Sequence, residues 1–183
     1  METVDIIATI IGVFTTVAAV SGMQFKNMKY ILISQLISNS LLVVQYILQG
    51  TVSGSGVVIL GIVQVTIGYV LGRMNKAFPL YLTVLFIIGH TVISIISYSV
   101  PYDILALIAA WIFAISMVQT NSSVCRALTL INLSLWLIYD FGTGAYSAVL
   151  THAIILLLTA VAVIRLDRGE WKAAARKILG INK

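Results

Sequence analysis

The stretch AYSAVLTHAIILLLTAVAVI, residues 145–164, runs for 20 residues without an Asp, Glu, Lys or Arg, and Arg165 follows it directly. A helix needs about 20 apolar residues to cross the hydrocarbon core of a bilayer. Lys and Arg are enriched in loops on the cytoplasmic side of a membrane. The stretch therefore predicts a transmembrane helix that ends at the cytoplasmic face.

Six further stretches of similar length and hydropathy precede it, namely Asp5–Gly22, Tyr30–Leu48, Gly54–Gly72, Pro79–Tyr98, Tyr102–Val118 and Cys125–Tyr139. The 183 residues are 60% hydrophobic and only 9% charged, which leaves no room for a soluble domain. We therefore predict an all-α, polytopic membrane protein with seven transmembrane helices.

Seven crossings place all 11 basic residues on one side of the membrane: in the inner loops, after the seventh stretch and, for Arg126, just inside the inner end of the sixth. Four of the six acids fall at the opposite ends, at Glu2, Asp5, Asp103 and Asp140. This distribution predicts an amino terminus outside and a carboxyl terminus in the cytoplasm. Because topology accounts for the net charge of +5, no nucleic-acid partner is predicted.

The second and sixth stretches are similar at an offset of 93 residues, which aligns Asn39 with Asn132, Leu42 with Leu135 and Tyr46 with Tyr139. The turns that follow, Gly50-Thr51 and Gly144-Ala145, are also similar, with one residue inserted. Crossings one and five run in the same direction. We therefore predict two parallel three-helix bundles, residues 1–76 and 101–166, joined by a linker helix, residues 77–100. Parallel repeats are typical of transporters, with a binding site near the midplane.

Residues 167–183 are predicted to form an amphipathic cytoplasmic tail. Trp171, Ala174, Ala175 and Ile178 share one helical face, and Arg168, Lys172 and Arg176 share another. Such a helix lies on the inner leaflet and is attracted by anionic lipid.

Polar side chains form a stripe along each of the two similar helices. One stripe contains Gln35, Ser38, Asn39, Gln45 and Tyr46, and the other contains Thr129, Asn132, Trp136, Tyr139 and Asp140. Polar groups at that depth must face protein or water. One interpretation is a solute pocket in which Asn39, Asn132 and Gln35 donate and accept hydrogen bonds, Trp136 and Tyr139 stack on the solute, and Tyr46 is the symmetric partner of Tyr139. The alternative is hydrogen bonding that only holds the helices together.

Two histidines, His90 and His152, lie within the predicted crossings and are candidates for proton coupling. The alternative is a neutral histidine hydrogen-bonded between helices. Asp5, Asp103 and Asp140 are placed near the outer surface, and this lack of a midplane carboxylate disfavours a strongly ion-driven pump. No catalytic motif occurs, and Cys125 is the single cysteine, so we predict no enzyme, no metal site and no cofactor.

The run WLIYDFGTG at residues 136–144, Ile164-Arg165, and Leu48-Gln49-Gly50-Thr51 resemble the bacterial inner-membrane YgjV family. The resemblance covers nearly the whole chain. That family is grouped with the PQ-loop superfamily, which includes the SWEET sugar transporters. The resemblance thus implies the same three-plus-one-plus-three bundle with an outside amino terminus. It also implies that the linker helix packs to the side, with His90 outside the pocket.

The Pro-Gln pair of the superfamily is incomplete here, because Met23-Gln24 and Val118-Gln119 keep only the glutamine. The two prolines, Pro79 and Pro101, flank the linker helix instead. Without the proline bend, the bundle must open by another route, for which Gly12 and Gly22 are candidates.

The leading hypothesis is a small transporter or facilitator of a polar solute, such as a sugar, an amino acid or a vitamin, in the bacterial cytoplasmic membrane. The rival is a membrane protein that binds a partner or a ligand without transport. A lipid-modifying enzyme is a weaker third. The expected partners are the lipid bilayer and the solute, and a homo-oligomer stays an open alternative.

Overall fold

The computed structural model describes residues 3–178, without the side chains of residues 52–53 and 171–178. This range contains seven helices and no strand: α1 (Thr3–Met23), α2 (Met28–Leu48), α3 (Val52–Arg73), α4 (Leu80–Ile96), α5 (Asp103–Met117), α6 (Ser122–Thr143) and α7 (Tyr146–Ile178). Each helix coincides with one of the seven apolar stretches. The prediction of an all-helical polytopic protein is therefore confirmed.

Five of the helices are long and apolar enough to cross a membrane, namely α1, α2, α3, α6 and α7. The other two are apolar but shorter than their predicted crossings, with 17 residues in α4 and 15 in α5. At about 1.5 Å per residue they are roughly 25 and 22 Å long. The loop between them shortens both, because the Asp103 carboxylate accepts hydrogen bonds from the backbone N–H groups of Ser99 and Val100 at 2.7 and 3.0 Å.

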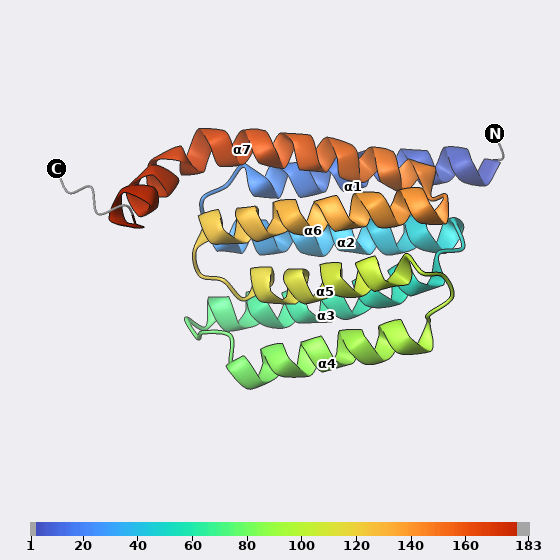
Figure 1. Cartoon of the computed structure of the whole chain (residues 1–183), viewed down its shortest axis with the longest axis horizontal. Coiled ribbons are helices and arrows are strands. Elements are labelled where there is room, and N and C mark those ends of the chain that lie inside the picture. Colours follow the sequence, from blue (N-terminus) through green and yellow to red (C-terminus); the bar gives the residue numbers. More distant parts are fainter. Residues whose placement is uncertain (1–2, 179–183) are drawn as a thin grey trace.

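Six helices form a closed, flattened ring. Neighbour contacts run from α1 through α2, α3, α5, α6 and α7 back to α1, and α4 packs outside the ring against α3 and α5. Figure 1 shows the ring as two layers, with α1, α2 and α3 behind α7, α6 and α5, and α4 at one edge. Helix α1 begins at one end of the bundle and α7 finishes at the other. The interior between the layers is where a site can form.

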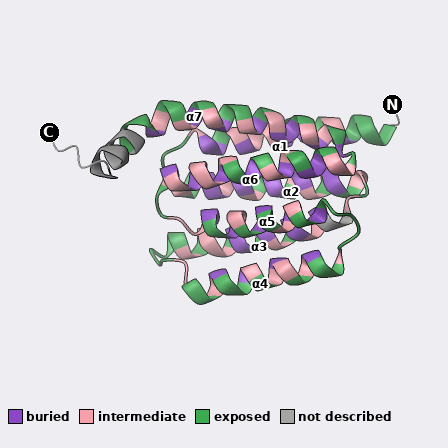
Figure 2. Cartoon of the chain, in the orientation of Figure 1, coloured by how far each residue is buried: buried purple, intermediate pink, exposed green. Residues whose placement is uncertain are grey.

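The burial pattern is apolar outside and polar inside. Large apolar side chains such as Ile96 (80% exposed) and Leu80 (78%) cover the outside, whereas Gln45, His90 and Asp140 are fully buried. Figure 2 shows exposed residues on the outward faces of the helices and buried ones between the layers. Exposed apolar area of this extent is stable only in contact with lipid. The protein therefore contacts the lipid bilayer.

The ends of α2 and α6 have matching local geometry. Asn27 and Asn121 are the N-caps, with side-chain oxygens that accept from Lys29 N–H at 2.9 Å and Ser123 N–H at 2.7 Å. After the two helices, Gly50 and Gly144 have φ angles of 71° and 76°. The next N–H groups, of Thr51 and Ala145, donate back to the carbonyls of Tyr46 and Asp140 at 3.0 and 2.9 Å. Both helices thus end in the same left-handed turn.

Replacing Gly144 or Gly50 with alanine should lower the free energy of unfolding by about 1–2 kcal/mol, because a Cβ is strained at positive φ. Gly169→Ala is the matched control, because Gly169 lies within α7, is exposed and has no heavy atom within 4 Å of the new Cβ. That change should be neutral or slightly stabilising. Unfolding in detergent with a denaturant measures the differences, and equal effects at all three sites would contradict the assigned turns.

Helix α7 continues without a break past the predicted boundary between residues 166 and 167. Arg168 is exposed, as predicted for a tail, but Asp167 is fully buried. The predicted amphipathic faces from Trp171 onward, including Lys172 and Arg176, lie outside the described side chains.

The glycines of α3 make close contacts with the second half of the chain. A Cβ on Gly54 would lie 3.2 Å from the Tyr139 hydroxyl, and one on Gly61 would lie 3.1 Å from the Phe113 ring. Because small residues let backbones approach closely, α3 packs tightly against α6 and α5 at these points.

Candidate functional site

An interior cavity of about 60 Å³ lies between the two layers. All seven helices contribute to its lining, which includes Thr15, Gln35, Ser38, Asn39, Gly61, His90, Ala110, Phe113, Thr129, Asn132, Trp136 and His152. This space is enough for a few water molecules. Pockets for organic ligands measure about 300–1,000 Å³. The cavity is thus polar and central, but it is too small for an organic solute in this conformation.

Six of the eight residues predicted for the site line this cavity: Gln35, Asn39, Asn132, Trp136, His90 and His152. The two asparagines differ in their bonding. The Asn132 amide nitrogen donates to the Ala109 carbonyl at 2.7 Å. The side chain of Asn39 makes no hydrogen bond within the described part of the chain. Asn132 therefore joins α6 to α5, and Asn39 presents a free amide to the cavity.

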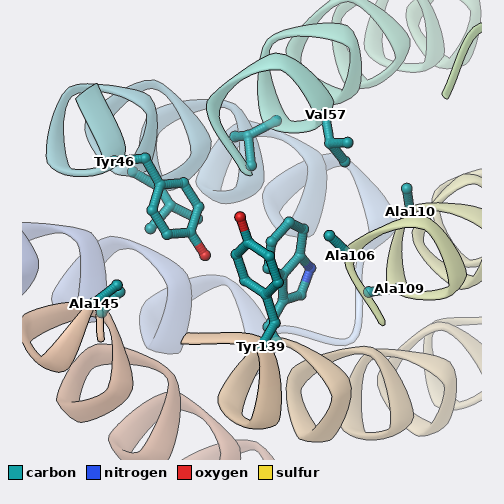
Figure 3. Packing of buried hydrophobic residues seen from close by; sticks show 11 residues of the cluster. Tyr46, Val57, Ala106, Ala109, Ala110, Tyr139 and Ala145 are labelled. Atoms are coloured by element: carbon teal, nitrogen blue, oxygen red, sulfur yellow. The ribbon is translucent and has the colours of Figure 1, made fainter. Parts of the chain in front are cut away.

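Tyr46 and Tyr139, the other two predicted residues, do not line the cavity. They pack beside it with Trp136, and the Tyr46 ring lies 5.8 Å from that of Trp136 and 6.4 Å from that of Tyr139. Figure 3 shows the two tyrosines facing each other among small residues of α5, including Ala106 and Ala109. The Tyr139 hydroxyl accepts a hydrogen bond from Gly54 N–H at 3.1 Å. Their contacts are therefore those of core residues.

Asp140 is fully buried inside the bundle, at the end of α6 that the sequence places near the outer surface. It lies near the end of α6, but α2 and α7 cover it there. The Tyr46 hydroxyl donates to Oδ1 at 2.8 Å, and His152 Nδ1 lies 2.5 Å from Oδ2. We name these three residues the Asp140 cluster. The stripe of α6 indicates that Asp140 faces inward, but only the pairing across helices shows that its carboxylate contacts Tyr46 and His152.

His90 reaches the cavity from α4, although α4 packs outside the ring. Its side chain is fully buried, and neither ring nitrogen has a hydrogen-bond partner in the part of the chain that the structure describes. The expectation that a laterally packed linker keeps His90 out of the pocket is therefore wrong. The ring passes between α3 and α5, where Gly61 and Ala110 line the same cavity with little side-chain volume.

A second buried charged group lies at the other end of α6. Arg126 and Asp167 form an ion pair with both side chains 1% exposed. Arg126 also donates to the Phe25 carbonyl at 2.8 Å, and Ser123 Oγ donates to Asp167 Oδ1 at 2.7 Å. We name Phe25, Ser123, Arg126 and Asp167 the Arg126 cluster. The sequence places Arg126 just inside the sixth apolar stretch, and the structure adds its pairing with Asp167.

The cavity lies between the two clusters. Along α6 the order is Arg126, then the cavity residues from Thr129 to Trp136, then Asp140. Fourteen residues of helix separate the two charged residues by about 21 Å. In the described residues, no group of three or more His, Cys, Asp or Glu side chains is placed to hold a metal ion. The lining offers amides, hydroxyls, imidazoles and an indole, which recognise a ligand by hydrogen bonds and stacking.

A helical bundle with a lipid-facing apolar exterior and a polar interior defines an integral membrane protein of the multi-pass class. Residues 6–170 match the family Imp-YgjV, described as bacterial inner membrane protein, and the chain belongs to that family. The protein is accordingly a multi-pass protein of the bacterial inner membrane. Neither the curated proteins nor the solved structures contain a match.

Proposed function

We propose that this protein is a transporter or facilitator of a small polar solute that binds in the central cavity. The observation that carries the proposal is a polar interior cavity bounded along α6 by a buried charged cluster at each end. Charged, hydrogen-bonded side chains that join several helices can close the path of a solute. They can separate again at a modest cost in free energy when water enters and replaces their hydrogen-bond partners. The two clusters would act as the two gates.

The proposed mechanism is alternating access between two parallel three-helix bundles, α1–α3 and α5–α7, with α4 as the linker. The matching caps and turns of α2 and α6 support this repeat. The ring contacts support the repeat as well. A twofold axis that exchanges the two bundles places α1 on α5 and α3 on α7, and the contact between α1 and α7 then corresponds to the contact between α5 and α3. The positive-inside distribution supports an outside amino terminus. A place in the PQ-loop superfamily is consistent with these features.

The small volume of the cavity favours a mechanism in which the helices move. A solute larger than a few water molecules enters only when one cluster opens and the layers separate on that side. Asn39 and Gln35 would bind the polar groups of the solute, and Trp136 would stack on it. Asn132 is a weaker candidate, because binding a solute would cost it the bond to Ala109.

Asn39→Leu should reduce solute flux by about tenfold or more, because it removes a free hydrogen-bonding group from the cavity without breaking a protein contact. The assay is uptake by proteoliposomes of a panel of labelled sugars, amino acids and vitamins. Ser40→Ala is the matched control, because Ser40 is the next residue of α2, is exposed and bonds only its own helix. Flux that Asn39→Leu leaves unchanged would overturn the pocket assignment.

The rival function, binding without transport, predicts no flux of any panel solute. It also predicts a cavity that water never enters. Cysteine at position 39, in a Cys125→Ser background, would then resist water-soluble thiol reagents added from either side. Labelling of that cysteine from both sides supports alternating access instead.

A further inference from the structure

Asp140 is a fully buried carboxylate with a single cationic partner candidate, His152. The sequence contains only two histidines, and His152 is the one that contacts an acid in the described residues. Burying an ionised carboxylate is unfavourable by several kcal/mol unless it is paired and hydrogen-bonded. The state of His152 therefore decides whether the Asp140 cluster carries a net charge.

The hydrogen bonds determine where a proton can bind. The Tyr46 hydroxyl donates to Asp140 Oδ1, and His152 Nδ1 lies against Oδ2. If Asp140 is ionised it only accepts, and His152 then donates its Nδ1 proton. The second ring nitrogen, Nε2, has no hydrogen-bond partner in the part of the chain that the structure describes, and His152 lines the cavity. A neutral ring with a proton on Nδ1 has its lone pair on Nε2. The open acceptor for a proton therefore belongs to a residue of the cavity wall.

A proton on Nε2 changes the charge of the cluster and breaks no bond in the protein. A hydrated proton in the cavity transfers to the Nε2 lone pair and leaves water behind. The carboxylate keeps its charge, the imidazole becomes an imidazolium, and the net charge of the cluster goes from −1 to zero. Because a buried net charge is unfavourable, proton binding stabilises this end of the closed bundle.

No other charged side chain offsets Asp140 among the described residues. Tyr46 from α2 donates to Asp140, Tyr139 from α6 packs beside Tyr46, and the Gly54 N–H of α3 donates to the Tyr139 hydroxyl. On α1 the acid Asp5 is exposed, and on α5 the Asp103 carboxylate bonds to the loop at Ser99 and Val100. The nearest Arg on the same helix, Arg126, is about 21 Å away along α6 and is paired with Asp167.

We propose that the Asp140 cluster is a proton-binding site that opens on the central cavity, and that H⁺ is the coupling ion of the transport proposed above. The coupling rests on that proposed function, whereas the proton site does not. Asp140 lies near the end of α6 and not at the midplane, but its partner His152 lines the solute cavity, so a proton can be bound beside the solute.

Trp136 is a built-in reporter for the proton site, because its ring stacks on His152 with centroids 6.0 Å apart and an interplanar angle of 19°. An imidazolium quenches the fluorescence of a neighbouring indole by accepting an electron from its excited state. In a Trp111→Phe, Trp171→Phe background, Trp136 is the single tryptophan. Acidification of the purified protein from about pH 8 to about pH 5 should reversibly reduce its emission.

His152→Gln should abolish this fluorescence step, and its amide can still donate to Asp140. Asp140→Asn should remove the fluorescence step from the same pH range. Without the carboxylate, a protonated His152 would be a buried cation with no counter-charge, and its formation would be unfavourable. His90→Gln is the matched control and should keep the step, since His90 contacts no acid. Emission that is independent of pH, or a fluorescence step that persists in His152→Gln, would overturn the proton site. If Asp140→Asn does not fold, His152→Gln by itself is the test of the site.

A pH gradient across proteoliposomes tests the coupling with any panel solute that shows flux. An acidic exterior should drive that solute against its concentration gradient, and His152→Gln should lose the accumulation. Solute flux that does not depend on the pH gradient would overturn the proposed coupling. Absence of flux for every solute instead overturns the proposed function, and the fluorescence step still decides the proton site.

Discussion

Replacing Asp167 with alanine should destabilise the protein by about 3–5 kcal/mol, because it leaves the Arg126 guanidinium buried without its counter-charge. Both side chains are 1% exposed, so water cannot replace the lost carboxylate without opening the bundle. The change also removes the acceptor of the Ser123 hydroxyl. Denaturant-induced unfolding in detergent micelles, followed by circular dichroism, measures the loss.

Glu170→Ala is the control for this prediction, because Glu170 is an exposed acid on the same helix. It should change stability by less than about 0.5 kcal/mol. The double replacement of Arg126 by methionine and Asp167 by leucine should recover most of the loss, because apolar residues of similar volume often substitute for a buried ion pair. A small effect of Asp167→Ala would show that the Arg126 cluster does not form.

Tyr139→Ala should destabilise the protein by about 3–5 kcal/mol, because it leaves a cavity where a fully buried ring contacts Tyr46 and Trp136. Tyr139→Phe isolates the hydroxyl and should lower stability by about 1–3 kcal/mol, because the Gly54 N–H loses its acceptor at the start of α3. The same unfolding measurement compares the two variants.

Ile138→Ala is the control, since Ile138 is the preceding residue and is 53% exposed. Its replacement should alter stability far less than Tyr139→Ala does. If Tyr139→Ala had a similarly small effect, the ring would not be part of the core, and its predicted role in stacking on a solute would regain support.

Most of the helical architecture was predictable from local sequence features. Runs of apolar residues between polar turns place the helices within a few residues, except for the end of α7, which continues to Ile178. The bilayer admits only helices because they satisfy their own hydrogen bonds. The stripes of α2 and α6 were also predictable, because polar residues at helical spacing must face the interior. These stripes correctly brought Gln35, Asn39, Asn132 and Trp136 to one cavity.

The lengths of α4 and α5 and the role of the tyrosines were less predictable. Hydropathy does not show that Asp103 caps the loop before α5, and this cap shortens the apolar segments available as helix. Tyr46 and Tyr139 share the stripe of the asparagines, but they lie about one turn beyond the last lining residues, Leu42 and Trp136. Residues that share a helical face point in the same direction, but the shared face does not show how far along the helix the cavity extends. It therefore cannot distinguish core residues from residues that line the cavity.

The sequence by itself determined the class of protein, the number of helices and the faces that point inward, because hydropathy and helical periodicity are local properties of the chain. Tertiary structure alone decided which polar groups meet. Tyr46 and Asp140 are 94 residues apart, Arg126 and Asp167 are 41 apart, and His90 reaches the cavity from outside the ring. Such contacts depend on the rotation and register of packed helices, which small side chains at the crossings set, and no single segment contains that information.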